Sequence, residues 1–137
     1  MTRTQRKPRR SPCPVACALD AIGDKWTLLL VRDMLFGRAH FREFLASPEG
    51  IASNILSDRL RRLVDARLVE TYASPQRADR LAYRLTDRGR TLGPVLEALK
   101  DWGLAVIPGT EARMGSAAGV TGVTGAATTS RSAAPRP

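Results

Sequence analysis

The side chains with the clearest chemistry in this sequence lie in one amphipathic segment, residues 50–66. At about 100° per residue, Leu56, Leu60, Leu63 and Val64 fall on one face of a helix, and the opposite face is polar. The polar face offers an amide, a hydroxyl and guanidinium groups, which hydrogen-bond base edges and phosphates when a helix lies in the major groove of DNA. The candidate DNA-contacting residues here are Ser53, Asn54, Ser57, Asp58, Arg59, Arg61 and Arg62. Amphipathic helices are also common in proteins that bind no DNA, so the neighbouring elements must support this interpretation.

Two strand-like runs follow the helix, at residues 68–73 and 81–86, with a polar stretch between them. Leu81, Tyr83 and Leu85 alternate with other residues at the period of a strand that is buried on one face. A polar helix followed by a hairpin with Arg77 and Arg80 near its tip is the layout of a winged helix-turn-helix, whose wing reaches the DNA backbone. The alternative is that both arginines only solvate a loop.

Three shorter helical patterns come first and would support the polar helix, at residues 15–22, 24–36 and 40–46. Asp24 is placed to cap the second of them and Gly37 to end it. The residues expected to face the core are Trp26, Leu29, Leu30, Leu35, Phe41, Phe44 and Leu45. Residues 47–50 form a turn, which makes the third pattern the first half of a helix-turn-helix.

A last helix is expected from a Thr86 cap to about Ile107, just before Pro108. Its apolar stripe comprises Leu92, Val95, Leu96, Leu99, Trp102 and Val106. The remaining core is too small to cover this stripe, which favours a homodimer through the first and last helices. The alternative is that the helix folds back onto its own domain.

The net charge of +9 is unevenly distributed along the 137 residues. Residues 1–12 hold five basic residues and no acid, and residues 109–137 are mostly small, so both segments are expected to be disordered around one domain at 13–108. Within that domain the positive charge concentrates at residues 53–90, which hold nine arginines and five acids. DNA binding requires this placement, on the polar helix and the hairpin.

The remaining composition excludes several classes of function. His40 is the only histidine, so we expect no metal and no other cofactor, and we expect His40 to contact a DNA phosphate. No acid pair, Ser/His arrangement or phosphate-binding glycine loop is present, and therefore we do not expect an enzyme. Because no apolar run approaches the ~18 residues of a membrane span, we expect a cytoplasmic protein. In that reducing compartment the two cysteines are expected to be free thiols.

Several motifs in residues 13–103 together resemble the HxlR-type winged helix-turn-helix regulators of bacteria, relatives of the MarR group. These motifs are Cys13-Pro14, Ile22-Gly23-Asp24-Lys25-Trp26-Thr27-Leu28-Leu29, Phe36-Gly37, Phe41-Arg42-Glu43-Phe44, Gly50-Ile51 with Leu56-Ser57-Asp58-Arg59-Leu60, and Tyr83-Arg84-Leu85-Thr86 with Gly89. The resemblance implies a homodimeric transcription factor that senses a reactive electrophile, an oxidant or a metabolite. The sequence departs from the family at Ala52, where a capping serine is common, and at Arg67, where a glycine is common.

Cys13 is the candidate for redox sensing. The resemblance implies this role, because family members that sense oxidants use a cysteine at the matching position, just before the first helix, where a helix N-terminus favours thiolate. The alternative for Cys13 is that it is a small buried residue that packs the first helix. Cys17 is expected to have only such a packing role.

The sequence therefore predicts a mainly α-helical winged helix-turn-helix with a small β-hairpin, dimeric, acting as a sequence-specific transcriptional regulator. Its expected partners are double-stranded operator DNA, a second copy of the chain and a small-molecule or oxidant effector. The alternative function is a winged-helix module that binds only protein, which would not need a locally positive helix and wing. The sequence leaves open the operator, the effector and whether transcription is repressed or activated.

Overall fold

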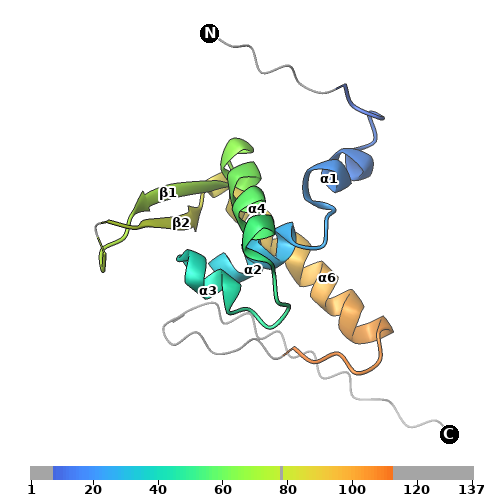
Figure 1. The fold of residues 1–137 in the computed structure, drawn as a ribbon. Helices are drawn as coiled ribbons and strands as arrows, with labels where there is room; N and C mark the ends of the chain where they lie inside the picture. The colour runs from blue at the N-terminus through green and yellow to red at the C-terminus, as the bar shows by residue number, and fades with distance from the viewer. Residues whose placement is uncertain (1–7, 78, 113–137) are drawn as a thin grey trace, which may run out of the picture.

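The computed structural model describes residues 8–77 and 79–112, and it shows a helical body from which a hairpin projects (Figure 1). In chain order the elements are α1 (Pro14–Ile22), α2 (Thr27–Leu35), α3 (Phe41–Leu45), α4 (Ser53–Asp65), β1 (Val69–Ala73), β2 (Leu81–Leu85), α5 (Asp87–Arg90) and α6 (Gly93–Val106). The expected mainly α-helical winged helix-turn-helix is confirmed, with α3 and α4 as the helix pair and the β1–β2 hairpin as the wing. Most of the expected basic arm and tail, at residues 1–7 and 113–137, lies outside the described residues.

The core forms around one face of α4. Leu56, Leu60 and Leu63 are at most 2% exposed, as their spacing predicts, and each contributes roughly 1.5–3 kcal/mol of burial free energy. They pack in one cluster with residues from the other elements, including Val31, Phe44, Val69 and Leu85. The helix begins at Ser53, three residues later than the pattern suggested, because Gly50 has a positive φ of 71° and Ala52 is extended with ψ 145°.

Helix α2 packs on the core through a stripe that sequence reasoning placed only in part. Leu30, Val31 and Met34 are buried, whereas the expected core residue Leu35 is 37% exposed. The buried positions follow the spacing of one helix face, and Leu35 lies about 100° away from Met34. Leu45 is also 36% exposed, so its expected burial is wrong as well, since the five residues of α3 bury only Phe44.

The wing is a two-stranded antiparallel hairpin in which Val69 pairs with Leu85 and Ala73 with Leu81. The simple alternation predicted for β2 is wrong at its outer end, where Leu81 is 60% exposed and Ala82 is fully buried. Ala82 pairs with Tyr72, and the Arg84 guanidinium lies over the Tyr72 ring, 4.6 Å from its centroid. Residues that pair directly share one face of a sheet, so Tyr72 and Arg84 cover the face of Ala82, while Leu81 lies beyond the body.

The single helix expected after the wing is divided into α5 and α6. Thr86 caps α5 as predicted, because its side-chain oxygen accepts the Gly89 N–H at 3.1 Å. Pro94 has no N–H to donate to the Arg90 carbonyl, so the helical hydrogen bonding is interrupted there. The Thr91 and Leu92 N–H groups bond the carbonyls three residues earlier, those of Arg88 and Gly89, instead of four residues earlier. Within α5, position 89 requires a glycine, since a Cβ there would lie 2.0 Å from the Leu68 carbonyl oxygen.

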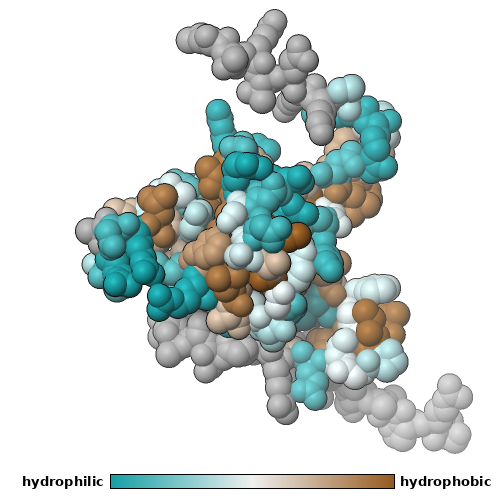
Figure 2. All heavy atoms as spheres, viewed as in Figure 1, coloured by the Kyte–Doolittle hydropathy of each residue, from teal (hydrophilic) through white to brown (hydrophobic). Residues whose placement is uncertain are grey.

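Helices α1 and α6 contain no buried residue in the single chain. Leu92 and Leu96 reach the core cluster, but the rest of the α6 stripe is 40–58% exposed at Val95, Leu99, Trp102 and Val106. In α1, Val15 and Leu19 are 64% and 57% exposed. Figure 2 shows the resulting hydrophobic surface over α1 and at the C-terminal end of α6.

The turn from α4 into β1 closes the helix with a left-handed residue. Arg67 has φ +59°, the Leu68 N–H bonds the Leu63 carbonyl, and the Arg67 N–H bonds the Val64 carbonyl. This is a Schellman motif, in which a glycine is usual because other side chains cost about 1–2 kcal/mol in that conformation. The turn therefore forms with Arg67 at the position where the resemblance noted above implies a glycine.

Candidate nucleic-acid interface

The polar face of α4 is the most exposed part of the helix. The side chains of Arg61 and Arg62 are 71% and 67% exposed, and Ser53, Asn54 and Ser57 are exposed at its N-terminal half. The residue before the helix, Ala52, supplies no side-chain cap. The face therefore presents donors that can bond phosphates, and both donors and acceptors that can pair with base edges.

Arg59 and Asp58 differ from the other candidates because both are partly buried. Arg59 Nε donates to Asp24 Oδ2 at 2.9 Å, which ties α4 to the loop before α2. Asp24 also accepts the Trp26 and Thr27 N–H groups, each at 3.1 Å. Burial alone would raise the pKa of Asp24, but these bonds together with those from Thr27 and Arg59 side chains lower it. Arg59 is thus placed as a link between α4 and α2.

The turn between α3 and α4 is fixed to α2 through a buried carboxylate that the sequence analysis did not single out. Asp33 is 3% exposed, and its Oδ1 accepts from Arg32 Nε and Nη2 at 3.1 and 2.9 Å. Its Oδ2 accepts the Ser47 hydroxyl, and Arg38 Nη1 donates to Ser47 Oγ at 2.6 Å. An acid within the apolar run of α2 was the available sequence signal, since buried charges are normally paired.

Arg32 extends this network to the residue just before Gly50. Its Nη1 and Nη2 donate to the two carboxylate oxygens of Glu49 at 2.6 and 2.9 Å, a bidentate pair. These hydrogen bonds lower the pKa of Glu49, against the opposite effect of burial. The pair therefore stabilises the turn at neutral pH, and this contribution is lost as the pH falls through the pKa of Glu49.

His40 lies between α3 and the wing. Its Nδ1 is 2.6 Å from Glu43 Oε1, and its Nε2 is 2.9 Å from Ser74 Oγ. Ser74 is 3% exposed and its N–H bonds the Arg80 carbonyl at the base of the wing loop. The Tyr83 N–H also bonds the Ala39 carbonyl at 2.8 Å, so two contacts join the wing to the start of α3. Both ring nitrogens of His40 face groups of the chain itself, and contact with a phosphate stays a prediction.

The two arginines of the wing loop are exposed, as their expected role requires. No ion pair to Arg77 or Arg80 is found within residues 8–77 and 79–112, whereas Arg84 on β2 pairs with Glu70 at 2.8 Å. The hydrophilic tip of the hairpin stands out from the body in Figure 2. The hairpin thus holds Arg77 and Arg80 away from the core on an anchored base.

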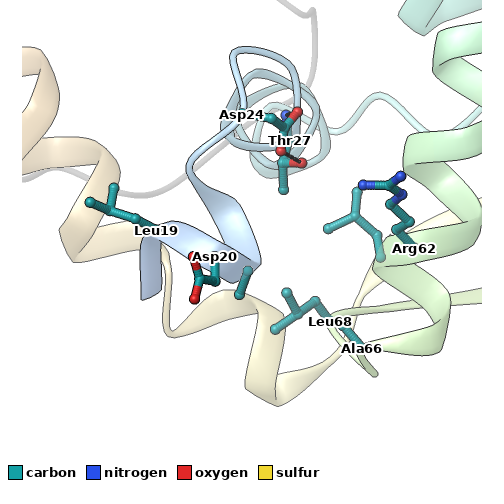
Figure 3. Close-up of a pocket in the computed structure, with 9 residues that line it drawn as sticks. Leu19, Asp20, Asp24, Thr27, Arg62, Ala66 and Leu68 are labelled. Carbon is teal, nitrogen blue, oxygen red and sulfur yellow. Dashed lines mark hydrogen bonds between the residues drawn. The ribbon is translucent and has the colours of Figure 1, made fainter. Parts of the chain in front are cut away.

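A cavity of about 300 Å³ lies between α1, the start of α2 and the C-terminal end of α4 (Figure 3). Asp20, Asp24 and Arg62 are among its polar lining residues, and Leu19 and Leu68 are among its apolar ones. The Asp20 carboxylate is paired with Arg10 at 2.7 Å. In the described part of the chain, no group of three metal-ligating side chains is found there or elsewhere.

Cys13 is an exposed free thiol at the N-cap of α1. Cys17 is half-buried, and its Sγ donates to the Ser11 carbonyl oxygen at 3.2 Å. In the single chain the alternative in which Cys13 packs as a buried residue is wrong, and a packing role for Cys17 agrees with its position.

None of the helices in the described ranges is both long and apolar enough to cross a membrane.

Comparison with known proteins identifies the family. The model of the HxlR-like helix-turn-helix family matches residues 21–111. YybR of Bacillus subtilis, an HTH-type transcriptional regulator, is 35% identical over 96 residues, which are 70% of this chain and 77% of YybR. Rv3095 of Mycobacterium tuberculosis, another HTH-type regulator, is 38% identical over 94 residues, 69% of this chain but only 59% of its own length.

A solved structure agrees with this assignment. The redox regulator HypR in its oxidised form superimposes with a TM-score of 0.62 at 35% identity, covering 68% of this chain and 96% of HypR. The chain belongs to the HxlR-like helix-turn-helix family, as the sequence motifs predicted.

We predict that His40→Ala releases the wing without unfolding the domain, because it removes the hydrogen bond to Ser74. Amide hydrogen exchange of residues 72–84 should accelerate by about 5- to 10-fold, the effect of one lost hydrogen bond of roughly 1 kcal/mol. Exchange in α4 should stay unchanged. Arg42→Ala, an exposed position two residues further along the chain, is the control and should leave wing exchange as it is. Equal exchange in both variants would show that His40 does not anchor the wing.

Proposed function

We propose that this member of the HxlR-like family is a dimeric, sequence-specific DNA-binding transcriptional regulator in the cytoplasm. The observation that carries the proposal is the exposed face of α4, where Arg61 and Arg62 stand next to polar side chains while the opposite face is fixed in the core. A second support is the wing, which carries Arg77 and Arg80 beside the same helix pair. Relatives named as HTH-type transcriptional regulators agree with this function.

The test of DNA binding is selection of duplexes from a random library by the full chain, followed by gel shift of the enriched and a scrambled sequence. A regulator enriches one sequence and binds it more tightly than the scrambled duplex, typically by 10³-fold or more. A protein-interaction module would enrich none, and that result would contradict the proposal.

Double-stranded operator DNA would be read by α4 and held by the wing. A helix in the major groove contacts base edges through side chains on its outer face, which here are Asn54, Ser57 and Arg61. Arg77 and Arg80 would lie along the sugar-phosphate backbone, where contacts add affinity without sequence information. His40 would add a phosphate contact only if it left Ser74 or Glu43.

We predict different effects for arginines of α4 and of the wing. Arg61→Ala should weaken binding to the selected duplex by about 1–3 kcal/mol and weaken binding to the scrambled duplex less. Arg77→Ala and Arg80→Ala should weaken both equally and reduce the slope of affinity against salt, because they remove phosphate contacts. Gel shifts at several salt concentrations measure both effects. If Arg61→Ala reduced both affinities equally, α4 would not be the reading element.

A second copy of the chain would cover the apolar surfaces of α1 and α6. Exposed hydrophobic side chains on two helices at the two ends of the domain are unusual for a monomer of this size. A twofold-related pair would also present two α4 helices to successive major grooves, roughly 34 Å apart.

We predict that the full chain is a dimer of two 14.9 kDa copies by light scattering at micromolar concentration. Trp102→Glu should produce monomers, since it places a charge in the centre of the exposed α6 stripe. Glu97→Ala, five residues earlier and on the opposite side of α6, is the matched control and should remain dimeric. A wild-type monomer under these conditions would contradict the assembly.

The effector is proposed to be an oxidant or electrophile that reacts at Cys13. Three observations support this: the thiol is exposed, it precedes the first turn of α1, and α1 carries part of the proposed dimer surface. HypR, whose structure is similar, is named a redox regulator. Modification at the start of α1 would change how two copies pack and therefore the separation of their α4 helices.

We predict that diamide lowers the affinity of the wild-type protein for its selected duplex and leaves Cys13→Ser unaffected. Cys13→Ser should bind DNA as the wild type does without oxidant, whereas Cys17→Ser should both bind and respond. Gel shifts with and without diamide, combined with mass spectrometry of the thiols, measure this response. Unchanged affinity together with two free thiols in the treated wild type would rule out Cys13 as the sensor.

A further inference from the structure

Asp58 is an acid placed within the exposed face that would meet negatively charged DNA. It lies on α4 with its side chain 29% exposed, and three guanidinium groups from the same helix surround it. Its Oδ1 accepts from Arg61 Nη2 at 2.8 Å. Its Oδ2 accepts from Arg59 Nη1 and lies 3.0 Å from Arg62 Nε. Both carboxylate oxygens are thus occupied by arginines that face outward or link to α2.

This cluster is connected to the body of the domain. Arg59, which contacts Asp58, also donates to Asp24 at 2.9 Å, and Asp24 is itself held by the Trp26 and Thr27 N–H groups. A chain of charge-assisted contacts therefore runs from the first turn of α2 to Arg61 and Arg62. Such contacts restrict the directions in which long side chains can point.

The cluster contributes little to folding stability. Ion pairs with partners as exposed as Arg61 and Arg62 are worth little, because water screens them and ordering two long side chains costs entropy. What the carboxylate does change is the behaviour of two arginines on the exposed face. Each arginine loses freedom, and the face loses one unit of positive charge.

We propose that Asp58 is a positioning and specificity-determining residue, which orients Arg61 and Arg62 toward base edges and reduces their attraction to DNA of any sequence. This inference rests on the DNA binding proposed above. A flexible arginine reaches any phosphate, and phosphate contacts carry no sequence information. An arginine held by a carboxylate keeps its planar guanidinium in one orientation. Only a base edge that presents two acceptors to that guanidinium can replace the carboxylate without loss of hydrogen bonds.

The chain offers a matched control for the charge itself. Asp65 is an exposed acid on the same polar face of α4, two turns further along the helix, and no ion pair to it is found among residues 8–77 and 79–112. Asp65→Asn removes the same unit of charge as Asp58→Asn and leaves the arginines of the cluster as they are. The two variants therefore separate charge from orientation.

The experiment measures the affinity of full-length variants for the duplex selected by the wild type and for its scrambled sequence. Asp58→Asn should bind the scrambled duplex about fivefold more tightly, with a steeper salt dependence, because repulsion of phosphate is removed and the arginines are released. Its preference for the selected duplex should fall by about tenfold or more. Asp65→Asn should strengthen both complexes equally and keep the preference. Asp58→Glu, which restores a carboxylate at the same position, should regain most of it.

A double-mutant cycle tests whether Asp58 acts through Arg61. The combined Asp58→Asn and Arg61→Ala variant should lose less preference than the sum of the two single losses, because one of the two side chains that Asp58 orients is then absent. Thermal melting of each variant should stay within a few degrees of the wild type, since the ion pairs of the cluster contribute little to folding stability.

Three results would overturn the inference. Equal changes in both affinities for Asp58→Asn and Asp65→Asn would show that Asp58 acts only through its charge. Additive losses of preference in the cycle would show that it does not act through Arg61. Weaker binding of Asp58→Asn to the selected duplex with unchanged scrambled binding would indicate that Asp58 itself accepts from a base. If the wild type selects no sequence at all, the proposed function fails first, and that result is distinct from these three.

Discussion

The position of α4 depends on a carboxylate that is buried on α2 and bonded to the turn before α4. Asp33 is removed from water on α2, and an ion in such a place costs several kcal/mol unless its partners compensate. Arg32, Arg38 and the Ser47 hydroxyl supply those partners, and the last belongs to the turn that leads into α4. Because the carboxylate is satisfied only when the turn lies against α2, one arrangement of the helix pair is favoured over others.

The same chemistry recurs at two further places with different consequences. Asp24 pairs with Arg59 and joins the middle of α4 to the start of α2, while His40 connects Glu43 and Ser74 and joins α3 to the wing. Together with the Asp33 network, these contacts connect α2, α3, α4 and the hairpin. A surface built from a helix and a separate hairpin is rigid only if both are fixed to one body, and these polar links fix both here.

Sequence reasoning succeeded where one element carries its own signal. The two faces of α4 and the two strands around a polar loop are local patterns, and so is the Thr86 cap. Leu35 and Leu45 were misplaced because hydrophobicity says less than position on the helix about which side chains reach the core. Pro94 was a local signal for the division into α5 and α6, and the prediction of a single helix did not take it into account. Contacts such as His40 with Ser74, 34 residues apart, depend on how the elements assemble and have no local signature.

The separation of roles on α4 has a consequence for the history of such proteins. The residues that hold the helix in place, Leu56, Leu60 and Leu63, share no position with the outward side chains at Asn54, Ser57 and Arg61. After a gene duplication, one copy can therefore change its outward residues, acquire a different target and remain folded, because surface substitutions rarely cost more than about 0.5 kcal/mol. Divergence along this route is limited by Asp58, since a new set of outward residues has to keep, or replace, the group that orients them.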